Sequence, residues 1–510
     1  MTRSGPRLRM LLRAVAATAV LATAAGATSA AAAPAPAPAP APAGAAAVPL
    51  PPELEAVRAA EATALYGSPD QRPPEERKTG LVSLGDSEIS GEGVGRYEPG
   101  TDGPDNWCHR SPEAAIHRTG IEADVTYNVS CSGAYTGNIR IGGSPQYADE
   151  LVQSDNLAIK ARNTRVKMVL LVAGANDDLR FGPVMTDCVT RYILLQGPCA
   201  PTYAPGWQAR VDALVPKVTQ TVRDLRTVMR EAGYADADYR LVVMGYPSPI
   251  GPDFRDNPDF PGKLICGGMG YDSDTVWGRN TAVPAFQRGM REVARATGAV
   301  YLDNSRLFHG HEVCHQDAWA RGLYIDLSHF PPDSNSVRQS FHPNARGHAA
   351  FASCLTQLYA SGLREAGCAD VASSGRPELF PFAWDDAYRP LKAASGPCLD
   401  VEGAVSRNGT RVLGWDCHGG RNQGWWYDPD RGSLHTELSQ DRCLDVPGGD
   451  ARAGTALIVW NCHGGANQRF ARVGDTLRPS SAQSLCATAG AAGEALRLRA
   501  CDGSAGQRFA

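Results

Sequence analysis

Four short polar blocks of this chain contain the residue types that nucleophilic attack on a carbonyl group requires. Ser87, in a Gly-Asp-Ser turn, supplies a hydroxyl, Gly133 and Asn176 supply hydrogen-bond donors, and His342 supplies a base. Acyl transfer needs these groups at one place, because the nucleophile must lose a proton and the developing oxyanion must be hydrogen-bonded. A Gly-Asp-Ser triplet alone is common in turns, so it is the complete set that indicates catalysis.

The elements around these blocks alternate between strands and helices. Strand-like apolar runs cover residues 80–84, 123–129, 166–173, 239–245 and 299–302. Helical spacing of apolar residues is clearest over residues 207–232 and 283–296, and helices are also expected over 51–65 and 344–360. Strands joined by helical crossovers predict an α/β fold of three layers, in which helices cover both faces of a parallel sheet.

The order of these elements places the four blocks at one edge of the sheet. Ser87 follows the first predicted strand, Gly133 the second and Asn176 the third, while His342 precedes the last helix. The carboxyl edge of a parallel sheet is where ligand sites form in such folds. We therefore expect the four residues to converge in one cleft.

This succession of Ser, Gly, Asn and His resembles the SGNH (GDSL-like) hydrolase family over about residues 78–366. The stretch 85–93 also looks like that of secreted actinobacterial esterases and lipases of this family. The resemblance implies Ser87 as nucleophile and His342 as general base, then as acid to the leaving alcohol. It also implies an oxyanion hole made by the main-chain N–H groups of Ser87 and Gly133 and by the Asn176 side chain. No cofactor is implied.

One position departs from the family pattern. The family usually places an aspartate three residues before the histidine, where this chain has Gln339. The Gln339 carbonyl is one candidate to orient the imidazole, but a carbonyl carries no full charge to support the imidazolium. Asp326 and Asp333 are the other candidates. Glu88, next to the nucleophile, is either solvated or influences which substrate charge is accepted.

The last part of the chain contains three repeats. Cys-Leu-Asp-Val at residues 398–401 recurs at 443–446, and a weaker copy, Leu-Cys-Ala, lies at 485–487. Each copy ends in Gln-x-Trp or Gln-x-Phe, at 423–425, 468–470 and 507–509. Three copies of about 40 residues predict a threefold structure or a short array.

The repeats resemble the ricin-type β-trefoil lectin family over about residues 387–510. That family binds sugars with an aspartate, an aromatic platform and an asparagine, so that the apolar face of the sugar stacks while its hydroxyls are hydrogen-bonded. The matching residues of the first two repeats are Asp400, Trp415, Asn422, Asp445, Trp460 and Asn467. The third repeat has Thr488, Arg499 and Gly506 there, so we expect no third site. Leu413 and Ile458 replace a polar residue of the family, which leaves a purely structural trefoil as the alternative.

The cysteine count predicts disulfides. There are 14 cysteines and no C-x-x-C, which in an exported chain favours disulfides over metal thiolates. Repetition along the trefoil predicts the pairs Cys398–Cys417, Cys443–Cys462 and Cys486–Cys501. Proximity in sequence and the usual disulfides of the hydrolase family suggest Cys108–Cys131, Cys188–Cys199, Cys266–Cys314 and Cys354–Cys368.

The N-terminal residues 1–33 have the features of an export signal. Four arginines precede an apolar run at 14–25, which is too short and too rich in alanine for a stable membrane span, and small residues follow at 31–33. A retained anchor is the alternative. Residues 34–50 predict an Ala/Pro-rich spacer, 51–368 the hydrolase domain, 369–386 a linker and 387–510 the trefoil. We expect a secreted, extracellular protein without a stable membrane span.

The composition excludes some partners. A net charge of -4 without a long basic block argues against nucleic acid and leaves esters and sugars as ligands. His309, His311, Glu312 and His315 are the best candidates for a metal cluster, but their spacing fits no common zinc site. We therefore interpret them as a loop and predict no metal.

Three hypotheses follow. The leading one is a secreted serine ester hydrolase that the trefoil holds at a glycan-bearing target, where its substrate is a lipid ester or an acylated carbohydrate. Within that reaction class, a lipase or phospholipase competes with a carbohydrate esterase. The third is a non-enzymatic lectin with a degenerate hydrolase domain, which the missing aspartate motivates.

Overall fold

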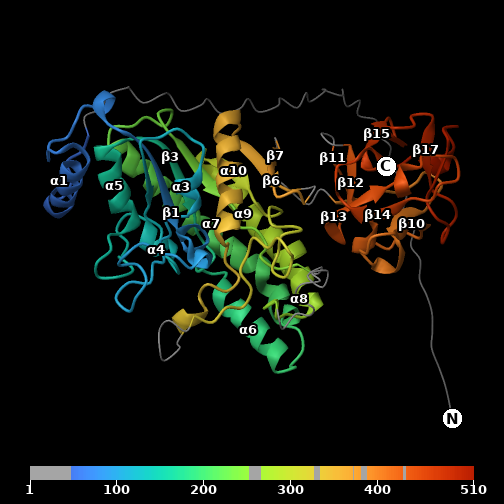
Figure 1. Ribbon diagram of the computed structural model, residues 1–510, viewed down its shortest axis with the longest axis horizontal. Helices are drawn as coiled ribbons and strands as arrows, with labels where there is room; N and C mark the ends of the chain where they lie inside the picture. The colour runs from blue at the N-terminus through green and yellow to red at the C-terminus, as the bar shows by residue number, and fades with distance from the viewer. Residues whose placement is uncertain (1–46, 252–265, 327–333, 371–372, 381–387, 429–431) are drawn as a thin grey trace, which may run out of the picture. The chain divides into compact units, whose positions relative to one another are not determined.

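A seven-stranded, mostly parallel sheet forms the centre of the first domain (Figure 1). The computed structural model describes residues 47–251, 266–326, 334–370, 373–380, 388–428 and 432–510, so the expected signal and most of the spacer lie outside the described residues. The strands are β1 (Thr79–Gly85), β2 (Val125–Asn128), β3 (Arg165–Val172), β4 (Arg240–Met244), β5 (Val300–Asp303), β6 (Glu365–Ala369) and β7 (Glu378–Phe380). Their order is β2-β1-β3-β4-β5-β6-β7, and only β7 pairs antiparallel with its neighbour.

The central strands are buried on both faces. From Val169 to Val172 every residue of β3 is inaccessible to solvent, and β1 is buried from Gly80 onward. Continuous burial rather than alternation is what a parallel sheet covered on both sides produces. The expectation of a three-layer α/β fold is confirmed.

Two groups of helices cover the sheet. Helices α5 (Gln153–Asn163), α7 (Ala200–Glu231) and α9 (Val283–Thr297) pack together, and α1 (Pro52–Tyr66) packs on α5. Helices α3 (Ala115–Arg118) and α10 (Ala345–Ser361) form the other group. Helices α2 (Ser87–Ser90), α4 (Thr136–Ile139), α6 (Phe181–Ile193) and α8 (Asp272–Trp277) belong to the connections between the strands and the other helices. Phe286, Met290 and Val293 show why α9 forms, since they lie on one helical face and are buried.

Several features of this domain differ from the sequence-based expectation, and β6 was not among the five expected strands. Helix α7 begins at Ala200 rather than near residue 207, because the Asp274 carboxylate accepts hydrogen bonds from the N–H groups of Cys199 at 3.1 Å and Ala200 at 2.8 Å. This distant side chain caps the helix, and the local sequence offers only Pro201, in the first turn, as a start signal. Strand β7 lies within the stretch expected to be a linker and extends the sheet next to β6.

The C-terminal domain is an all-β trefoil. Its strands are β8 (Arg389–Pro390), β9 (Cys398–Val401), β10 (Thr410–Trp415), β11 (Gly424–Asp428), β12 (Ser433–Thr436), β13 (Ser439–Asp445), β14 (Ile458–Asn461), β15 (Phe470–Val473), β16 (Thr476–Pro479), β17 (Leu485–Thr488) and β18 (Arg497–Ala500). Trp425, Phe470 and Phe509, one from each repeat, are buried in a common core. Lys392 and Ala510 exchange two main-chain hydrogen bonds, of 3.2 and 3.0 Å, which closes the ring of repeats.

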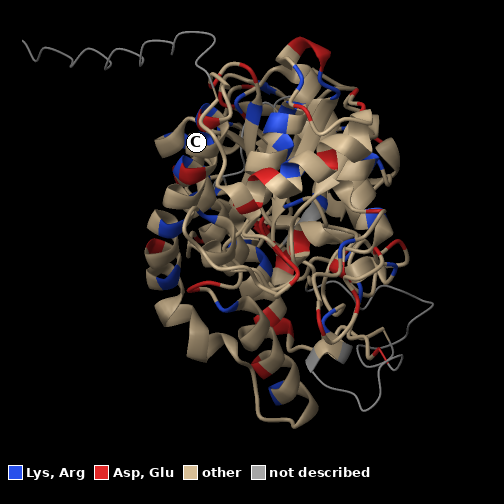
Figure 2. Ribbon diagram, turned by 90° about the vertical axis from the view of Figure 1, so that its left-hand side faces the viewer, with Lys and Arg blue, Asp and Glu red and all other residues tan. Residues whose placement is uncertain are grey.

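All 14 cysteines are paired, and the seven pairs coincide with those expected from the sequence. Basic and acidic residues are interspersed along the ribbon (Figure 2). Among the described residues, no helix combines the length and apolarity needed to cross a bilayer.

Candidate active site

The turn that presents Ser87 depends on Gly85. Its φ is +142°, and a Cβ there would lie 1.9 Å from the Val172 carbonyl oxygen, so only glycine fits between β1 and β3. The Asp86 N–H donates to the same carbonyl at 3.1 Å. The chain therefore turns sharply at the end of β1 and places Ser87 as the first residue of α2.

Two carboxyl groups flank the serine. Asp86 is fully buried; it accepts hydrogen bonds from the Glu88 N–H at 3.1 Å and from the Tyr246 hydroxyl at 2.6 Å. Burial raises the pKa of Asp86 to about 7, although the Tyr246 hydrogen bond opposes the shift. Burial, and then the neighbouring Asp86 carboxylate, also raises the pKa of Glu88. Both groups therefore favour the neutral form more than ordinary carboxyls do.

The strand order brings the expected oxyanion donors to either side of the serine. Because β1 lies between β2 and β3, the loops that carry Gly133 and Asn176 flank the Ser87 turn. The Cys131 N–H donates to the Gly85 carbonyl at 3.1 Å, and the Asn176 amide donates to the Ala134 carbonyl at 3.0 Å. These contacts join the three loops into one unit.

His342 faces the serine from the segment before α10. Its Nε2 lies 2.9 Å from Ser87 Oγ, and its Nδ1 lies 3.0 Å from the Ser340 carbonyl oxygen. A carbonyl only accepts, so Nδ1 carries the proton and Nε2 is available to accept from the serine hydroxyl. The backbone is fixed because Phe341, at φ +61°, and His342 exchange main-chain hydrogen bonds with Arg321 of 2.8 and 2.9 Å.

The carbonyl that orients the imidazole belongs to Ser340 and not to Gln339, which was the expected candidate. The Gln339 side chain is buried; it accepts from Arg321 at 2.6 Å and donates to the Asp326 carboxylate at 3.0 Å. Asp333, the other candidate, lies outside the described residues. The positive φ of Phe341 turns the chain so that the nearer carbonyl faces Nδ1, and the sequence contains no local signal for this.

The histidine-rich loop consists of internal contacts. His311 Nε2 lies 2.9 Å from Asp370, and the His311 ring stacks on Trp319 at 3.8 Å. Glu312 pairs with Arg279 at 3.2 Å and lies 3.4 Å from His315. These pairings agree with the interpretation of the cluster as a loop.

The first trefoil repeat brings its expected sugar-binding residues together. Asp400 is buried and accepts from Asn422 at 2.8 Å and from Gln423 at 2.9 Å. Trp415 is 44% exposed, so part of its indole is accessible to a ligand. His418, which the sequence reasoning missed, places Nε2 3.3 Å from Asp400.

The second repeat reproduces this arrangement and the third does not. Asp445 accepts from Asn467 at 2.9 Å, Trp460 is 41% exposed, and His463 Nε2 lies 3.5 Å from Asp445. The Cys-His pairs at 417–418 and 462–463 were the signal for the two histidines. In the third repeat a Cβ at Gly506 would lie 2.5 Å from the Ala489 carbonyl, so an asparagine does not fit there.

The fold and these sites define a two-domain protein, a parallel-sheet hydrolase domain followed by a β-trefoil. Residues 83–350, more than half of the chain, match the GDSL-like Lipase/Acylhydrolase family, and the chain belongs to this family. Residues 382–460 and 430–510 match ricin-type β-trefoil lectin domains.

Several known proteins resemble parts of the chain. Lipase 2 of Streptomyces coelicolor is 27% identical over 308 residues, which are 58% of this chain and 90% of that protein. The extracellular lipase of Streptomyces rimosus is 22% identical in its crystal structure, with a TM-score of 0.37, over 56% of this chain and 99% of that one. The β-trefoil lectin of Vibrio vulnificus hemolysin/cytolysin, with N-acetyl-D-lactosamine bound, is 26% identical over 24% of this chain and 92% of that one, with a TM-score of 0.21.

Proposed function

We propose that this protein is a secreted serine hydrolase that cleaves carboxylic esters through an acyl-enzyme. The observation that carries the proposal is the 2.9 Å distance between Ser87 Oγ and His342 Nε2, with Nδ1 held on the Ser340 carbonyl. Ser87 Oγ bonds to the ester carbonyl carbon while its proton passes to Nε2, and the alcohol leaves with that proton. Water then attacks the acyl-enzyme in the same way and releases the acid.

The developing oxyanion is assigned to three donors. They are the N–H groups of Ser87 and Gly133 and the amide of Asn176, which follow the neighbouring strands β1, β2 and β3. In the resting state the Asn176 amide donates to the Ala134 carbonyl, so its orientation is already fixed. Preorganised donors of this kind supply much of the rate enhancement in acyl transfer.

Hydrolysis of p-nitrophenyl acetate and butyrate tests the proposal. We expect Ser87→Ala to lose activity by at least 10³-fold, because the nucleophile is removed. Ser144→Ala, which truncates an exposed serine of the same domain, is the matched control and keeps the wild-type rate. Equal rates for wild type and Ser87→Ala reject the proposal. Glycan binding without fluorophosphonate labelling of Ser87 favours the non-enzymatic lectin instead.

We also propose that the first two trefoil repeats bind glycans and hold the enzyme at its target. The support is that both repeats combine a buried aspartate, hydrogen-bonded by an asparagine, with a half-exposed tryptophan. Stacking on an aromatic face together with hydroxyl recognition by an acid and an amide is chemistry suited to a sugar. The seven disulfides fit an oxidising, extracellular location.

A glycan array with aspartate variants tests this second part. The double variant Asp400→Ala, Asp445→Ala is expected to lose binding at least tenfold, since each site loses its central acceptor. Thr488→Ala changes the equivalent position of the third repeat and is expected to bind as wild type. No binding by the wild-type protein favours a purely structural trefoil.

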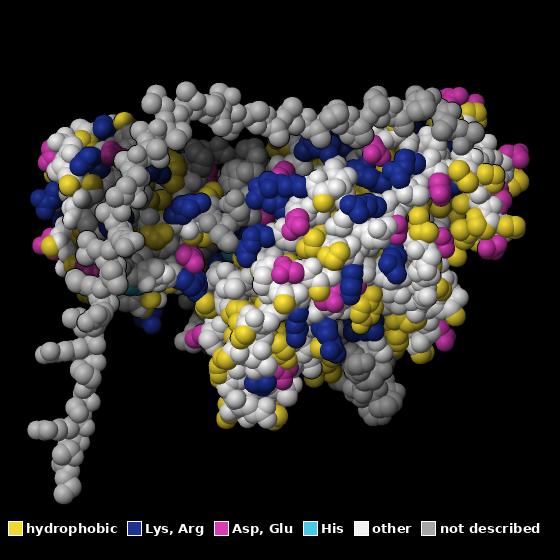
Figure 3. Space-filling model, turned by 180° about the vertical axis from the view of Figure 1, so that it is seen from behind, with side chains coloured by type: hydrophobic (Ala, Val, Ile, Leu, Met, Phe, Trp, Pro, Cys, Tyr) yellow, Lys and Arg dark blue, Asp and Glu magenta, His cyan; other side chains and the backbone are white. Residues whose placement is uncertain are grey.

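One observation favours a lipid ester over an acylated carbohydrate as substrate. Ile193, Leu194 and Leu195, at the end of α6, are 53%, 59% and 84% exposed. The lobe that α6 forms is labelled in the ribbon diagram of Figure 1, and the space-filling view of Figure 3 shows hydrophobic side chains on its surface. Helix α6 follows the carboxyl end of β3, the edge at which Ser87 and Asn176 lie. A group of exposed apolar side chains on the domain that carries the candidate ester hydrolase site is suited to contact with a lipid surface.

A further inference from the structure

A buried pair of a carboxylate and a histidine lies next to the candidate active site. Glu92 begins the 3-10 helix η2 (Glu92–Val94), five residues after Ser87, and its side chain is wholly buried. Both carboxylate oxygens lie 2.8 Å from His109 Nδ1. The other ring nitrogen, Nε2, lies 3.1 Å from the Asp102 carboxylate. Burying a carboxylate is costly unless it is paired, and this pairing offsets the cost.

The protein fixes the His109 ring by several independent contacts. Tyr97 stacks on it at 4.2 Å and Trp107 meets it edge-on at 5.5 Å, while the Tyr97 hydroxyl donates to the Glu92 carbonyl. His109 itself has a φ of +47°, a conformation that costs about 1–3 kcal/mol in a residue other than glycine. The contacts of the His109 ring therefore stabilise an unfavourable backbone conformation at this residue.

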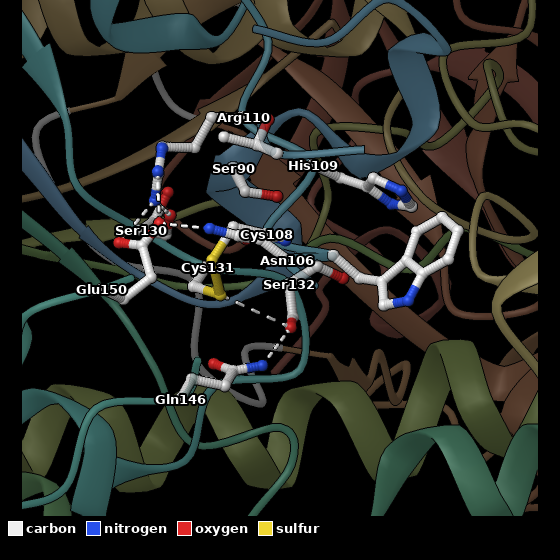
Figure 4. The surroundings of a disulfide bond; sticks show 12 residues. Ser90, Asn106, Cys108, His109, Arg110, Ser130, Cys131, Ser132, Gln146 and Glu150 are labelled. Atoms are coloured by element: carbon white, nitrogen blue, oxygen red, sulfur yellow. Dashed lines mark hydrogen bonds and ion pairs between the residues drawn. A yellow bond between two sulfur atoms is a disulfide. The ribbon is translucent and has the colours of Figure 1, made fainter. Parts of the chain in front are cut away.

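The same segment is tied to the loop that carries Gly133. Figure 4 shows His109, which directly follows Cys108, together with the Cys108–Cys131 disulfide and Ser132, which directly follows Cys131. The Ser132 N–H donates to the Cys108 carbonyl at 3.0 Å. The segment that carries His109 and the loop that carries Gly133 are thus joined by a disulfide and a main-chain hydrogen bond.

The 3-10 helix that Glu92 begins also packs against the segment that carries His342. A Cβ at Gly93 would lie 2.6 Å from the His342 carbonyl oxygen and 2.5 Å from that of Pro343, so η2 packs directly on this backbone. Burial raises the pKa of Glu92, but the His109 hydrogen bond and charge, with help from the charge of His342, outweigh it and hold the pKa below its ordinary value. Glu92 is therefore an ionised carboxylate within electrostatic reach of His342.

Arg338 and His348, two other titratable groups near His342, do not provide a negative charge. Burial lowers the pKa of His342; Glu92 is the main group that opposes the shift, followed by the Ser340 carbonyl, while the Arg338 charge adds to it. Burial lowers the pKa of the nearby His348 to about 3, so that ring is neutral at pH 7. Among these neighbours, Glu92 is the one that brings a full negative charge.

We propose that Glu92 is a positioning residue that supplies the negative charge missing at Gln339, and that it stabilises the imidazolium formed when His342 takes the proton of Ser87. His109 holds the carboxylate in place. Glu92 takes no proton: the proton moves from Ser87 Oγ to His342 Nε2 and then to the leaving alkoxide, and Nδ1 keeps its proton on the Ser340 carbonyl. This inference rests on the ester hydrolase proposed above.

The pH profile of kcat/KM for p-nitrophenyl butyrate tests the inference, because its acid limb reports the free imidazole. In Glu92→Gln, His342 loses a favourable charge, so the acid limb moves to lower pH by about one unit and kcat at the plateau falls about tenfold. KM changes little, since the charge acts on the transition state. In Glu92→Asp the carboxylate is withdrawn by one methylene, and the acid limb is expected to move in the same direction by a smaller amount. If Glu92→Gln does not fold, the acid limb of Glu92→Asp tests the inference.

Glu365→Gln is the matched control. Glu365 is a partly buried carboxylate on β6 that pairs with Arg295 at 3.0 Å, away from the candidate site. It is expected to leave the acid limb unchanged. Lower activity in the Glu92 variants with an unmoved acid limb assigns Glu92 a merely structural role and overturns the inference. Wild-type activity that Ser87→Ala leaves intact rejects instead the proposed hydrolase, and that result is independent of Glu92.

Discussion

The exposed apolar side chains at the end of α6 allow a quantitative prediction about lipid binding. The exposed fractions of Ile193, Leu194 and Leu195 correspond together to about two complete aliphatic side chains. Burying one such side chain is favourable by about 1.5–3 kcal/mol, so insertion of the tip into a bilayer interface contributes about 4 kcal/mol. Replacing Leu194 and Leu195 by Asp removes about three quarters of this, or about 3 kcal/mol, which weakens binding more than 100-fold.

Vesicle sedimentation and two kinds of substrate provide the assay. The double Asp variant is expected to lose binding to phosphatidylcholine vesicles and hydrolysis of emulsified triglyceride, while it keeps the wild-type rate on dissolved p-nitrophenyl butyrate. The fold should be unaffected, because both side chains are exposed and Asp tolerates the left-handed conformation of Leu195. Val57→Asp, on an exposed position of α1, is the control for added charge. Unchanged vesicle binding, or equal loss on both substrates, refutes the reasoning.

Three further predictions concern the turn around Ser87. Asn176→Ala removes one of three oxyanion donors and should lower kcat by about 10²–10³-fold with little change in KM; steady-state kinetics check this, and a loss below fivefold contradicts the assignment. Asp86 has a pKa of about 7 in the folded state against 3.8, so its protonated form stabilises the fold below pH 4 and this contribution, about 4 kcal/mol, is lost as the pH rises through 7. Asp86→Asn should therefore gain stability relative to wild type between pH 4 and pH 8 in urea unfolding, and parallel curves would argue against a perturbed Asp86. Gly85→Ala places a methyl group 1.9 Å from the Val172 carbonyl oxygen, so the yield of soluble, folded protein should collapse, whereas a well-folded and active variant would disprove the steric argument.

Local patterns in the sequence were sufficient for the main elements of the fold. The runs that form β1, β3 and β4 are mostly apolar, and short segments that contain Ser87 and Asn176 follow the first two. The sequence therefore indicated which edge of the sheet carries the site. The trefoil could be predicted because each of its three repeats ends in the same Gln-x-aromatic motif. Each of these signals is a local pattern, which the trefoil repeats three times along the chain.

The features that the sequence did not predict depend on contacts between segments that are distant along the chain. The start of α7 depends on Asp274, some 74 residues further along the chain. The carbonyl that orients His342 depends on the φ of Phe341 and on pairing with Arg321. Glu92 stood within the Gly-rich block after Ser87, but its partner His109 is 17 residues away and gave no spacing that predicts an ion pair. Such long-range pairs have no period in the sequence.

The reciprocal bonds between Lys392 and Ala510 make the trefoil a ring without a preferred origin. Since the two backbones already lie within hydrogen-bonding distance, a short peptide joining them would allow the chain to be opened at a different hairpin with every core aromatic still in place. The order in which the repeats are synthesised is therefore separable from the architecture they build.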